Sequence, residues 1–272
     1  MNIKHITSLS DPQLNIFCRL TEAQLRNRLE PELGVFIAES PKVIAIALKR
    51  GYEPTAVLTE EKFIETQVNA FADQLGDISV YVGSSQLLAQ LTGYELSRGM
   101  ICAMKRPKLP TVGEVCSQKR RIVIVDGVVN ATNTGAIFRA AAALGMDGLI
   151  FSHTCCDPLN RRSVRVSMGT VFQLPWTQLD KQTRLPQLFD QMRTDGFKII
   201  SMALSNNALP IDDQQIAKHN KLAIVLGNEG EGLDNETIKA SDYEAMIPMQ
   251  NGVDSLNVAA AAAVAFWQLK SK

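Results

Sequence analysis

The sequence has few of the features that mark secreted, metal-binding or membrane proteins. Its five cysteines include no C-x-x-C pair, and their odd number gives no complete disulfide framework. Only three histidines are present, so we expect no metal site and a reducing, cytoplasmic location. No apolar run approaches the roughly 18 residues of a membrane span, and the N-terminus lacks the apolar core of a signal peptide. We therefore expect no contact with a membrane.

A net charge is also absent, because 28 Lys and Arg residues balance 28 Asp and Glu residues. The chain as a whole has no field that would attract a nucleic acid. Positive charge is instead concentrated in residues 98–121 and 161–165. A solvated hinge and a solvated helix face are the simpler explanations of these two stretches. The alternative is contact with phosphates, for which the candidate residues are Arg98, Lys105, Arg106, Arg161, Arg162 and Arg165.

Length and composition predict two α/β domains. A chain of 272 residues is long enough for two, and a hydrophobic content of 46% supports a packed core. Short strands alternate with helices over residues 1–104, which predicts a small α/β sandwich. Two prolines among basic side chains in 105–120 indicate a semi-rigid linker. The alternation resumes over 121–272 and predicts a mostly parallel sheet.

Periodicity and turn residues give the expected elements. The expected strands are 35–38, 55–58, 80–82, 99–104, 122–125, 149–151, 171–174, 199–202, 222–226 and 245–247. The expected helices are a short one after Ser10-Asp11-Pro12, then 41–50, 60–75, 85–91, 134–144, 186–193, 235–241 and 258–269. Asn133 is expected to cap the N-terminus of helix 134–144, and Gly145 to end it.

The apolar run Leu222–Leu226 predicts a strand that is buried on both faces and ends in the glycine loop Gly227–Gly232. The loop has Gly-x-x-Gly-x-Gly spacing, which differs from the dinucleotide motif Gly-x-Gly-x-x-Gly. Glu229 and Glu231 would also repel a pyrophosphate. A ligand with hydroxyls or a positive centre suits the loop better, and the sulfonium compound S-adenosylmethionine is one. The alternative is an acidic turn that needs glycine for positive φ.

Arg139 lies among small side chains on its predicted helix. Gly135 and Ala136 precede it by one turn, and Ala142 and Ala143 follow it by one turn. An arginine on such a stripe needs an anionic or polar partner, because burying it unpaired is costly. A phosphate clamp and an intramolecular ion pair both satisfy that need.

A third loop follows the last expected strand. Pro248 in the segment Ile247-Pro248-Met249 interrupts the strand, so the backbone beyond it is free to contact a ligand. Ser255 and Asn257 stand directly before the final helix. Each is either a helix cap or part of a site.

Taken together and in this order, the motifs resemble those of the SpoU/TrmH family of RNA 2′-O-ribose methyltransferases in the SPOUT superfamily. The matching motifs are Asn133-x-Gly135-x-x-x-Arg139, Arg165-x-Ser167-Met168-Gly169, Gly227-Asn228-Glu229-x-x-Gly232, and Ile247-Pro248-Met249 followed by Ser255-Leu256-Asn257-Val258. The segment Gly34–Glu39 resembles the family's accessory domain, which is similar to ribosomal protein L30e. Ser40 stands where that segment usually has glycine.

The resemblance implies an L30e-like RNA-binding domain, a sheet with a trefoil knot near the C-terminus, and a homodimer whose active sites use both subunits. It implies 2′-O-methylation of ribosomal or transfer RNA, with ribosomal RNA favoured, and S-adenosylmethionine as methyl donor. The implied catalytic residues are Asn133, Arg139, Glu229, Ser255 and Asn257. The implied cofactor contacts are Leu226, Gly227, Asn228, Gly232, Ile247, Pro248, Met249, Ser255 and Leu256.

Two alternatives have distinct signatures. A non-catalytic RNA-binding protein with this fold would be expected to lack Arg139, Glu229 or Asn257, and all three are present. A nicotinamide-dependent enzyme would carry Gly-x-Gly-x-x-Gly after its first strand. The turn that begins at Asp126-Gly127 does not contain that motif.

Overall fold

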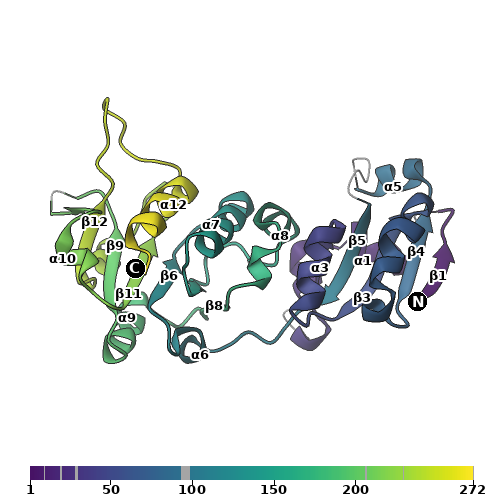
Figure 1. Cartoon of the computed structure of the whole chain (residues 1–272), viewed down its shortest axis with the longest axis horizontal. Coiled ribbons are helices and arrows are strands. Elements are labelled where there is room, and N and C mark those ends of the chain that lie inside the picture. The colour runs from purple at the N-terminus through teal and green to yellow at the C-terminus, as the bar shows by residue number, and fades with distance from the viewer. Residues whose placement is uncertain are drawn as a thin grey trace. The chain divides into compact units, whose positions relative to one another are not determined.

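The computed structural model describes residues 1–8, 10–18, 20–27, 30–92, 99–205, 207–228 and 230–271. These residues form two compact units (Figure 1). Unit 1 comprises Met1–Lys108 and Leu159–Gln173, and unit 2 comprises Leu109–Pro158 and Leu174–Lys272. Residues 159–173, expected within the C-terminal domain, thus cluster with the N-terminal part of the chain. Arg98 and Glu229 lie outside the described residues.

Unit 1 contains a mixed sheet of five strands in the order β1-β4-β3-β5-β2. The strands are β1 (Asn2–His5), β2 (Val35–Glu39), β3 (Pro54–Glu60), β4 (Ser79–Gly83) and β5 (Met100–Lys105). β5 runs antiparallel to both β3 and β2, and the other pairs are parallel. The helices are α1 (Asn15–Cys18), α2 (Glu22–Arg26), α3 (Pro41–Lys49), α4 (Ala72–Leu75), α5 (Ser85–Thr92) and α8 (Arg161–Ser167).

Two parts of unit 1 differ from the expectation. β1 was not predicted, because residues 2–5 are mostly exposed and lie at the sheet edge, where no buried apolar run marks a strand. The helix expected over 60–75 is a series of short pieces that includes a π-helical turn at Ile64–Val68, and only Ala72–Leu75 is α-helical. The leading helix does begin at Asp11, whose side chain accepts a hydrogen bond from the Gln13 backbone N–H.

Unit 2 contains a sheet of seven strands, all parallel, in the order β10-β12-β9-β11-β6-β7-β8. The strands are β6 (Arg121–Val125), β7 (Gly148–Phe151), β8 (Trp176–Gln178), β9 (Lys198–Met202), β10 (Leu209–Pro210), β11 (Leu222–Leu226) and β12 (Tyr243–Met246). β6 and β11 are buried throughout and pair at the centre of the sheet. The mostly parallel α/β sheet expected here is confirmed.

Helices cover both faces of this sheet. They are α6 (Val112–Cys116), α7 (Ala131–Ala143), α9 (Leu185–Thr194), α10 (Gln214–Ala217), α11 (Asn235–Lys239) and α12 (Val258–Leu269). Side chains of α6 and α9 pack with Ile122, Ile124 and Val225 in one core. Beyond the other face α12 packs against α7, and Phe138 of α7 stacks on Phe151 of β7 with 5.3 Å between ring centroids. Among the described helices, none has the length and apolarity needed to cross a bilayer.

Two further local predictions are wrong, one where the chain passes from unit 1 to unit 2 and one at α7, and the expected linker contains a helix. The strand expected at 171–174 is a 3₁₀ turn (Thr170–Phe172), and the strand forms at β8 instead. Helix α7 begins three residues earlier than expected, so its N-cap is Asn130 rather than Asn133. Within 105–120, α6 forms a helix with a capping box in which Thr111 and Glu114 bond each other's backbone N–H.

Candidate functional site

Three parallel strands end at the same edge of the unit 2 sheet and create a cavity. β9, β11 and β12 end at Met202, Leu226 and Met246, and a cavity of about 300 Å³ opens beyond them. Loops beyond the carboxyl ends of parallel strands are the usual ligand sites of such sheets. The lining residues are Met202–Leu204, Leu226–Asn228, Gly230–Leu233, Ile238, Ala245–Ile247, Met249, Ser255, Leu256, Val258 and Ala261.

Most of the expected cofactor contacts meet at this cavity. Its lining includes Leu226, Gly227, Asn228, Gly232, Ile247, Met249, Ser255 and Leu256. Pro248 is not among the lining residues. Met202–Leu204 were not expected at the cavity, because only the position of β9 beside β11 brings the end of that strand there.

The glycine loop closes tightly on its own backbone. A Cβ atom on Gly227 would lie 2.5 Å from the Gly232 carbonyl carbon and 2.7 Å from the Leu233 nitrogen. Asn228 and Gly232 also form an isolated antiparallel bridge. Backbone atoms cannot turn aside as a flexible side chain can, so position 227 has no room for a side chain. The requirement for glycine here is steric, since the left-handed φ of +72° falls at Gly232.

Asn228 fixes the interior of the same loop. Its Oδ1 accepts hydrogen bonds from the backbone N–H groups of Gly230 and Glu231, both at 2.8 Å. The side chain also lies against Gly127, where an added Cβ would be 3.3 Å from Asn228 Nδ2. Gly127 has φ +67° and follows β6. Asn228 therefore joins the cavity loop to the turn that leads into α7.

That turn is held by a second set of hydrogen bonds. The Gly127 N–H donates to Ser152 Oγ at 3.1 Å, and the Cys156 N–H donates to the Val128 carbonyl at 2.9 Å. Cys155 Sγ donates to the Val125 carbonyl, and burial raises the pKa of this thiol. A buried thiol that is kept protonated acts as a packing and donor group and is a poor nucleophile. The cysteines after β7 thus support the turn structurally.

A side-chain hydrogen bond joins two motifs that are far apart in the sequence. Asn257 Nδ2 donates to Asn133 Oδ1 at 3.2 Å. Asn257 also caps α12, because its Oδ1 accepts the Ala259 N–H at 3.0 Å. Asn130 takes the capping role at α7 by accepting the N–H groups of Thr132 and Asn133. The Asn133 side chain is therefore available to link the start of α7 to the start of α12.

Arg139 is exposed on α7 and does not line the cavity of its own chain. Among the residues that the structure describes, no hydrogen bond or ion pair involves its guanidinium. Gly135 is buried one turn before it, while Ala143 one turn after it is exposed. The alternative for this arginine was an ion pair inside the protein. No carboxylate in the described part of the chain forms one with Arg139. The guanidinium is available to a group from outside the chain.

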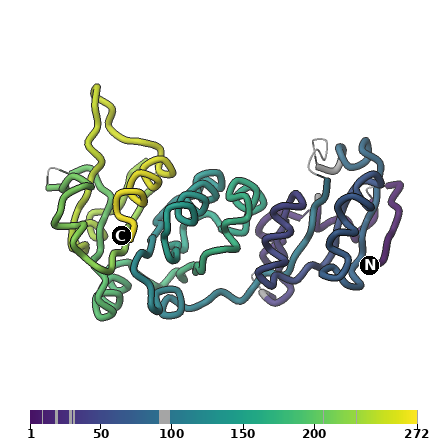
Figure 2. The backbone as a smooth tube through the Cα atoms, viewed as in Figure 1, coloured from purple at the N-terminus to yellow at the C-terminus, as the bar shows by residue number. Residues whose placement is uncertain are grey.

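The segment between β12 and α12 stands away from the rest of unit 2, as the yellow trace in Figure 2 shows. Residues 250–257 are all exposed, including Val253 at 52% and Leu256 at 40%. Ser255 belongs to this exposed segment and also reaches the cavity lining. The segment thus presents apolar side chains to solvent directly beside the cavity.

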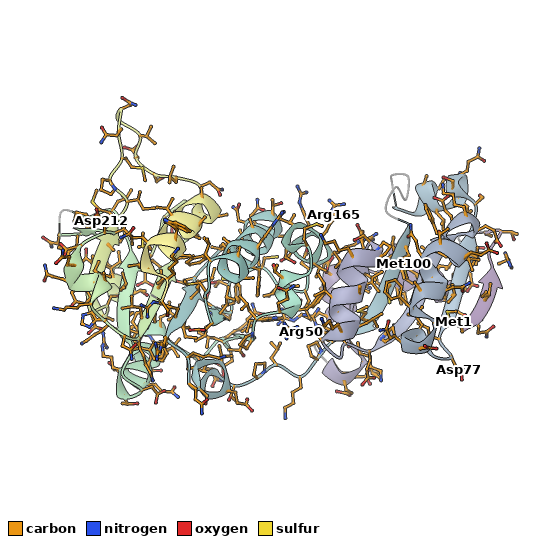
Figure 3. All side chains as sticks on the ribbon, viewed as in Figure 1. Met1, Arg50, Asp77, Met100, Arg165 and Asp212 are labelled. Carbon is orange, nitrogen blue, oxygen red and sulfur yellow. The ribbon has the colours of Figure 1, made fainter. Side chains whose placement is uncertain are left out.

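Two of the expected RNA-contacting arginines are used inside unit 1. Glu39 is nearly buried and accepts a hydrogen bond from Arg161 Nε, and Arg165 Nη1 lies 3.7 Å from its other carboxylate oxygen. Figure 3 labels Arg165 on α8. Lys105 pairs with Glu53 at 2.6 Å. Arg106 and Arg162 also have interactions within the chain. These basic side chains remain candidates for RNA contact. Arg161 is the least accessible to RNA, because its guanidinium is hydrogen-bonded to Glu39 and to the Phe17 carbonyl.

Comparison with known proteins agrees with this geometry. The SpoU rRNA Methylase family matches residues 120–267, which are more than half of the chain. An uncharacterized tRNA/rRNA methyltransferase of Mycobacterium bovis is 33% identical over 98% of this chain and 92% of its own length. The 23S rRNA (guanosine(2553)-2′-O)-methyltransferase RlmP of Bacillus subtilis is 26% identical over 87% of this chain and 89% of its own length.

Solved structures share the fold. The AdoMet-bound rRNA methyltransferase from Sinorhizobium meliloti superposes with a TM-score of 0.82 at 23% identity, covering 98% of this chain and 97% of that one. The SpoU methyltransferase AviRb from Streptomyces viridochromogenes gives 0.77 at 22% identity, covering 94% and 95%. With the Gly227 and Ile247–Leu256 motifs at one cavity and a family match over residues 120–267, the chain belongs to the SpoU rRNA methylase family of RNA methyltransferases.

Proposed function

We propose that this chain transfers a methyl group from S-adenosylmethionine to a ribose 2′-oxygen, with ribosomal RNA as the favoured substrate. The observation that carries the proposal is the Asn257–Asn133 hydrogen bond. It ties the loop at the cavity to the helix that carries Arg139. The name of the Bacillus subtilis relative specifies 2′-O-methylation of 23S rRNA, which supports both the reaction and the substrate class. Such an enzyme would work in the cytoplasm, where ribosomes are assembled.

The cavity has the chemistry that S-adenosylmethionine requires. Its apolar wall, which includes Met246, Ile247 and Leu256, suits an adenine ring and an aliphatic chain. Glu231 lines the same cavity and supplies negative charge near a cationic sulfonium. The loop around Gly227 brings backbone groups to the cavity, where they can hydrogen-bond ribose hydroxyls. Two solved relatives are described as bound to AdoMet.

The bound cofactor would supply an electrophilic methyl group on a positively charged sulfur. The ribose 2′-hydroxyl would be the nucleophile toward that methyl group and S-adenosylhomocysteine the leaving group, so the hydroxyl proton would have to be removed. Arg139 is a poor base because the pKa of a guanidinium is above about 12. We assign it to clamp the ribose and phosphate oxygens and so to lower the pKa of the hydroxyl, with the RNA phosphate accepting the proton. Asn133 and Asn257 would hold the Arg139 helix against the cofactor loop.

A second copy of the chain would complete this site. Arg139 lies outside the cavity of its own chain, so a single copy does not bring Arg139 and the cofactor cavity together. Six of the eight large apolar side chains that are exposed in the described structure belong to unit 2, and among them are Val253, Leu256, Val264 and Trp267. Trp267 is 61% exposed on α12, which packs against the Arg139 helix. A homodimer that covers α7, α12 and the segment 250–257 would bury these groups and bring in Arg139.

We also infer that the chain is knotted near its C-terminus. β12 lies beyond β9 in the sheet, whereas α12 packs against α7, which follows β6. The segment that connects β12 to α12 must therefore return past the ends of β9 and β11. It lines the same cavity as the closed loop 227–233. Such a return would thread the chain through that loop, although knots are rare in proteins.

The test is to incubate purified protein with methyl-labelled S-adenosylmethionine and unmodified transcripts of ribosomal and transfer RNA. Nucleoside mass spectrometry then identifies the product. We expect one 2′-O-methylated nucleoside in a ribosomal RNA. RNA binding without methyl transfer would favour a non-catalytic RNA-binding protein, and a base-methylated product would refute the ribose assignment.

A further inference from the structure

A second hollow in unit 2 lies at the opposite edge of the sheet from the cofactor cavity. Its volume is about 230 Å³, and it is bounded by the starts of β6 and β11 and by the end of α12. The strands are parallel, so their starting edge and their ending edge are separated by the length of β11, about 13 Å at 3.3 Å per residue. This volume is below the roughly 300–1,000 Å³ of typical cofactor and drug sites. The hollow suits a small group.

The wall of this hollow is basic. It contains Arg120, Arg121, Lys218 and Lys270, together with His219, and no Asp or Glu is among its lining residues. Arg120 and Lys218 are exposed. In the described part of the chain no carboxylate forms an ion pair with either side chain. Lys270 Nζ lies 3.3 Å from the centroid of the Trp267 ring.

Arg121 gives the floor of the hollow a buried positive charge. The residue is 6% exposed, and its guanidinium donates to the carbonyls of Asn220 at 2.6 Å, Arg120 at 3.0 Å and Leu269. Its hydrogen bonds are therefore satisfied by neutral groups. Burial lowers the pKa of Arg121, whereas Asp147 acts in the opposite direction. The Asp147 carboxylate accepts the backbone N–H groups of Arg120 and Arg121. A buried cation that is bonded to neutral carbonyls attracts an anion.

We propose that this hollow binds a phosphate group of the RNA backbone, remote from the ribose that is methylated. Exposed Arg and Lys side chains at the mouth are the usual phosphate contacts of nucleic-acid-binding proteins. The cofactor cavity at one edge of the sheet and the hollow at the other edge would then hold a structured RNA at two points and so fix its orientation. The inference rests on the proposed RNA substrate, and it joins Arg120 and Arg121, at the end of the first basic stretch, with Lys218 and Lys270, which lie outside both stretches.

The test uses the double variant Arg120→Ala/Lys218→Ala. Its binding to a ribosomal RNA transcript is measured as a function of salt concentration, beside the intact protein. The slope of log affinity against log salt should become shallower by about 1, because the contact with one phosphate is lost. The matched control is Lys181→Ala/Lys239→Ala, which removes the same charge from exposed lysines elsewhere in unit 2. S-adenosylmethionine affinity, measured by calorimetry, should be the same in all three proteins.

Three results would overturn the inference. One is an unchanged slope in the Arg120→Ala/Lys218→Ala variant, and another is an equal loss in the control, which would point to overall charge alone. The third is tight binding of inorganic tripolyphosphate that depends on Arg120 and Lys218 while RNA binding does not, which would assign the hollow to a free anion. Failure of the proposed function looks different, because the intact protein would then form no 2′-O-methylated nucleoside, whatever the salt slopes of the variants. A thermal melt confirms that each variant is folded.

Discussion

At the scale of the residue, Arg139 carries most of the chemistry proposed here and very little of the stability. It is exposed and has no ion pair among the described residues, so its replacement removes no buried contact. Surface substitutions of this kind usually change stability by less than about 0.5 kcal/mol. A guanidinium that holds two oxygens is different from an ammonium, which is a single point charge. A small effect on stability and a requirement for the two-oxygen grip of the guanidinium therefore distinguish a catalytic arginine from a structural one.

We therefore expect Arg139→Ala and Arg139→Lys to fold and to bind S-adenosylmethionine normally. Both should lose methyl transfer by roughly 100-fold or more, the usual cost of removing one donor from a transition state. Single-turnover methylation and a thermal melt are measured on each variant. If Arg139→Lys keeps near-normal turnover, a positive charge alone suffices and the bidentate clamp is wrong.

Gly227 is a residue whose replacement should damage the cofactor site itself. In Gly227→Ala the new Cβ would meet the Gly232 carbonyl carbon at 2.5 Å, so the loop must move. We expect a destabilisation of about 1–3 kcal/mol, which is typical of overpacking, together with weaker S-adenosylmethionine binding in calorimetry. Gly113→Ala on α6 is the matched control, because the nearest atom to the added Cβ would be Thr111 Oγ1 at 4.0 Å. Equal melting temperatures for the two variants would contradict the steric argument.

Ser40 offers a prediction about stability alone. It has φ +81° and ψ 145°, and its side chain makes no capping hydrogen bond. A non-glycine residue in this region costs about 1–3 kcal/mol. Ser40→Gly should therefore raise the melting temperature of unit 1 by a few degrees. Ser40→Ala keeps the strained φ and should bring no gain, so an equal gain from both variants would exclude backbone strain as the cause.

At the scale of the element, the sequence predicted the central strands of unit 2 well. β6 from Ile122 onward and β11 are continuous apolar runs because both of their faces are buried. Short edge elements were harder to predict. β8 has three residues, and the apolar run Val171–Leu174 next to it was mistaken for the strand. That run is apolar because Val171 and Phe172 are buried in unit 1.

Helix ends were predicted less well than helix centres. Asn130 and Asn133 are both good capping residues, and nothing in the spacing decides between them. In the structure Asn130 accepts two backbone N–H groups, and Asn133 bonds Asn257 instead. Most of the expected cofactor contacts do line the cavity, but the contribution of Met202–Leu204 depends on strand order. Strand order is a long-range property that local patterns do not contain.

At the scale of the whole molecule, the central claim is that the cavity of one copy works with Arg139 of another. Two variants that are each inactive provide the test. Arg139→Ala keeps the cavity intact, whereas Ile247→Trp fills the cavity with a large ring and keeps Arg139. Before mixing, each variant is checked for folding by a thermal melt and for dimer formation by light scattering.

The decisive measurement is methyl transfer to ribosomal RNA after the two variants are mixed in equal amounts and allowed to exchange subunits. In a symmetric dimer with shared sites, half of the dimers become mixed and each has one intact site, so activity should return to about a quarter of that of the intact protein. If each site lay within one chain, every site in the mixture would carry a defect. Activity that stays at the level of the separate variants would contradict the shared site.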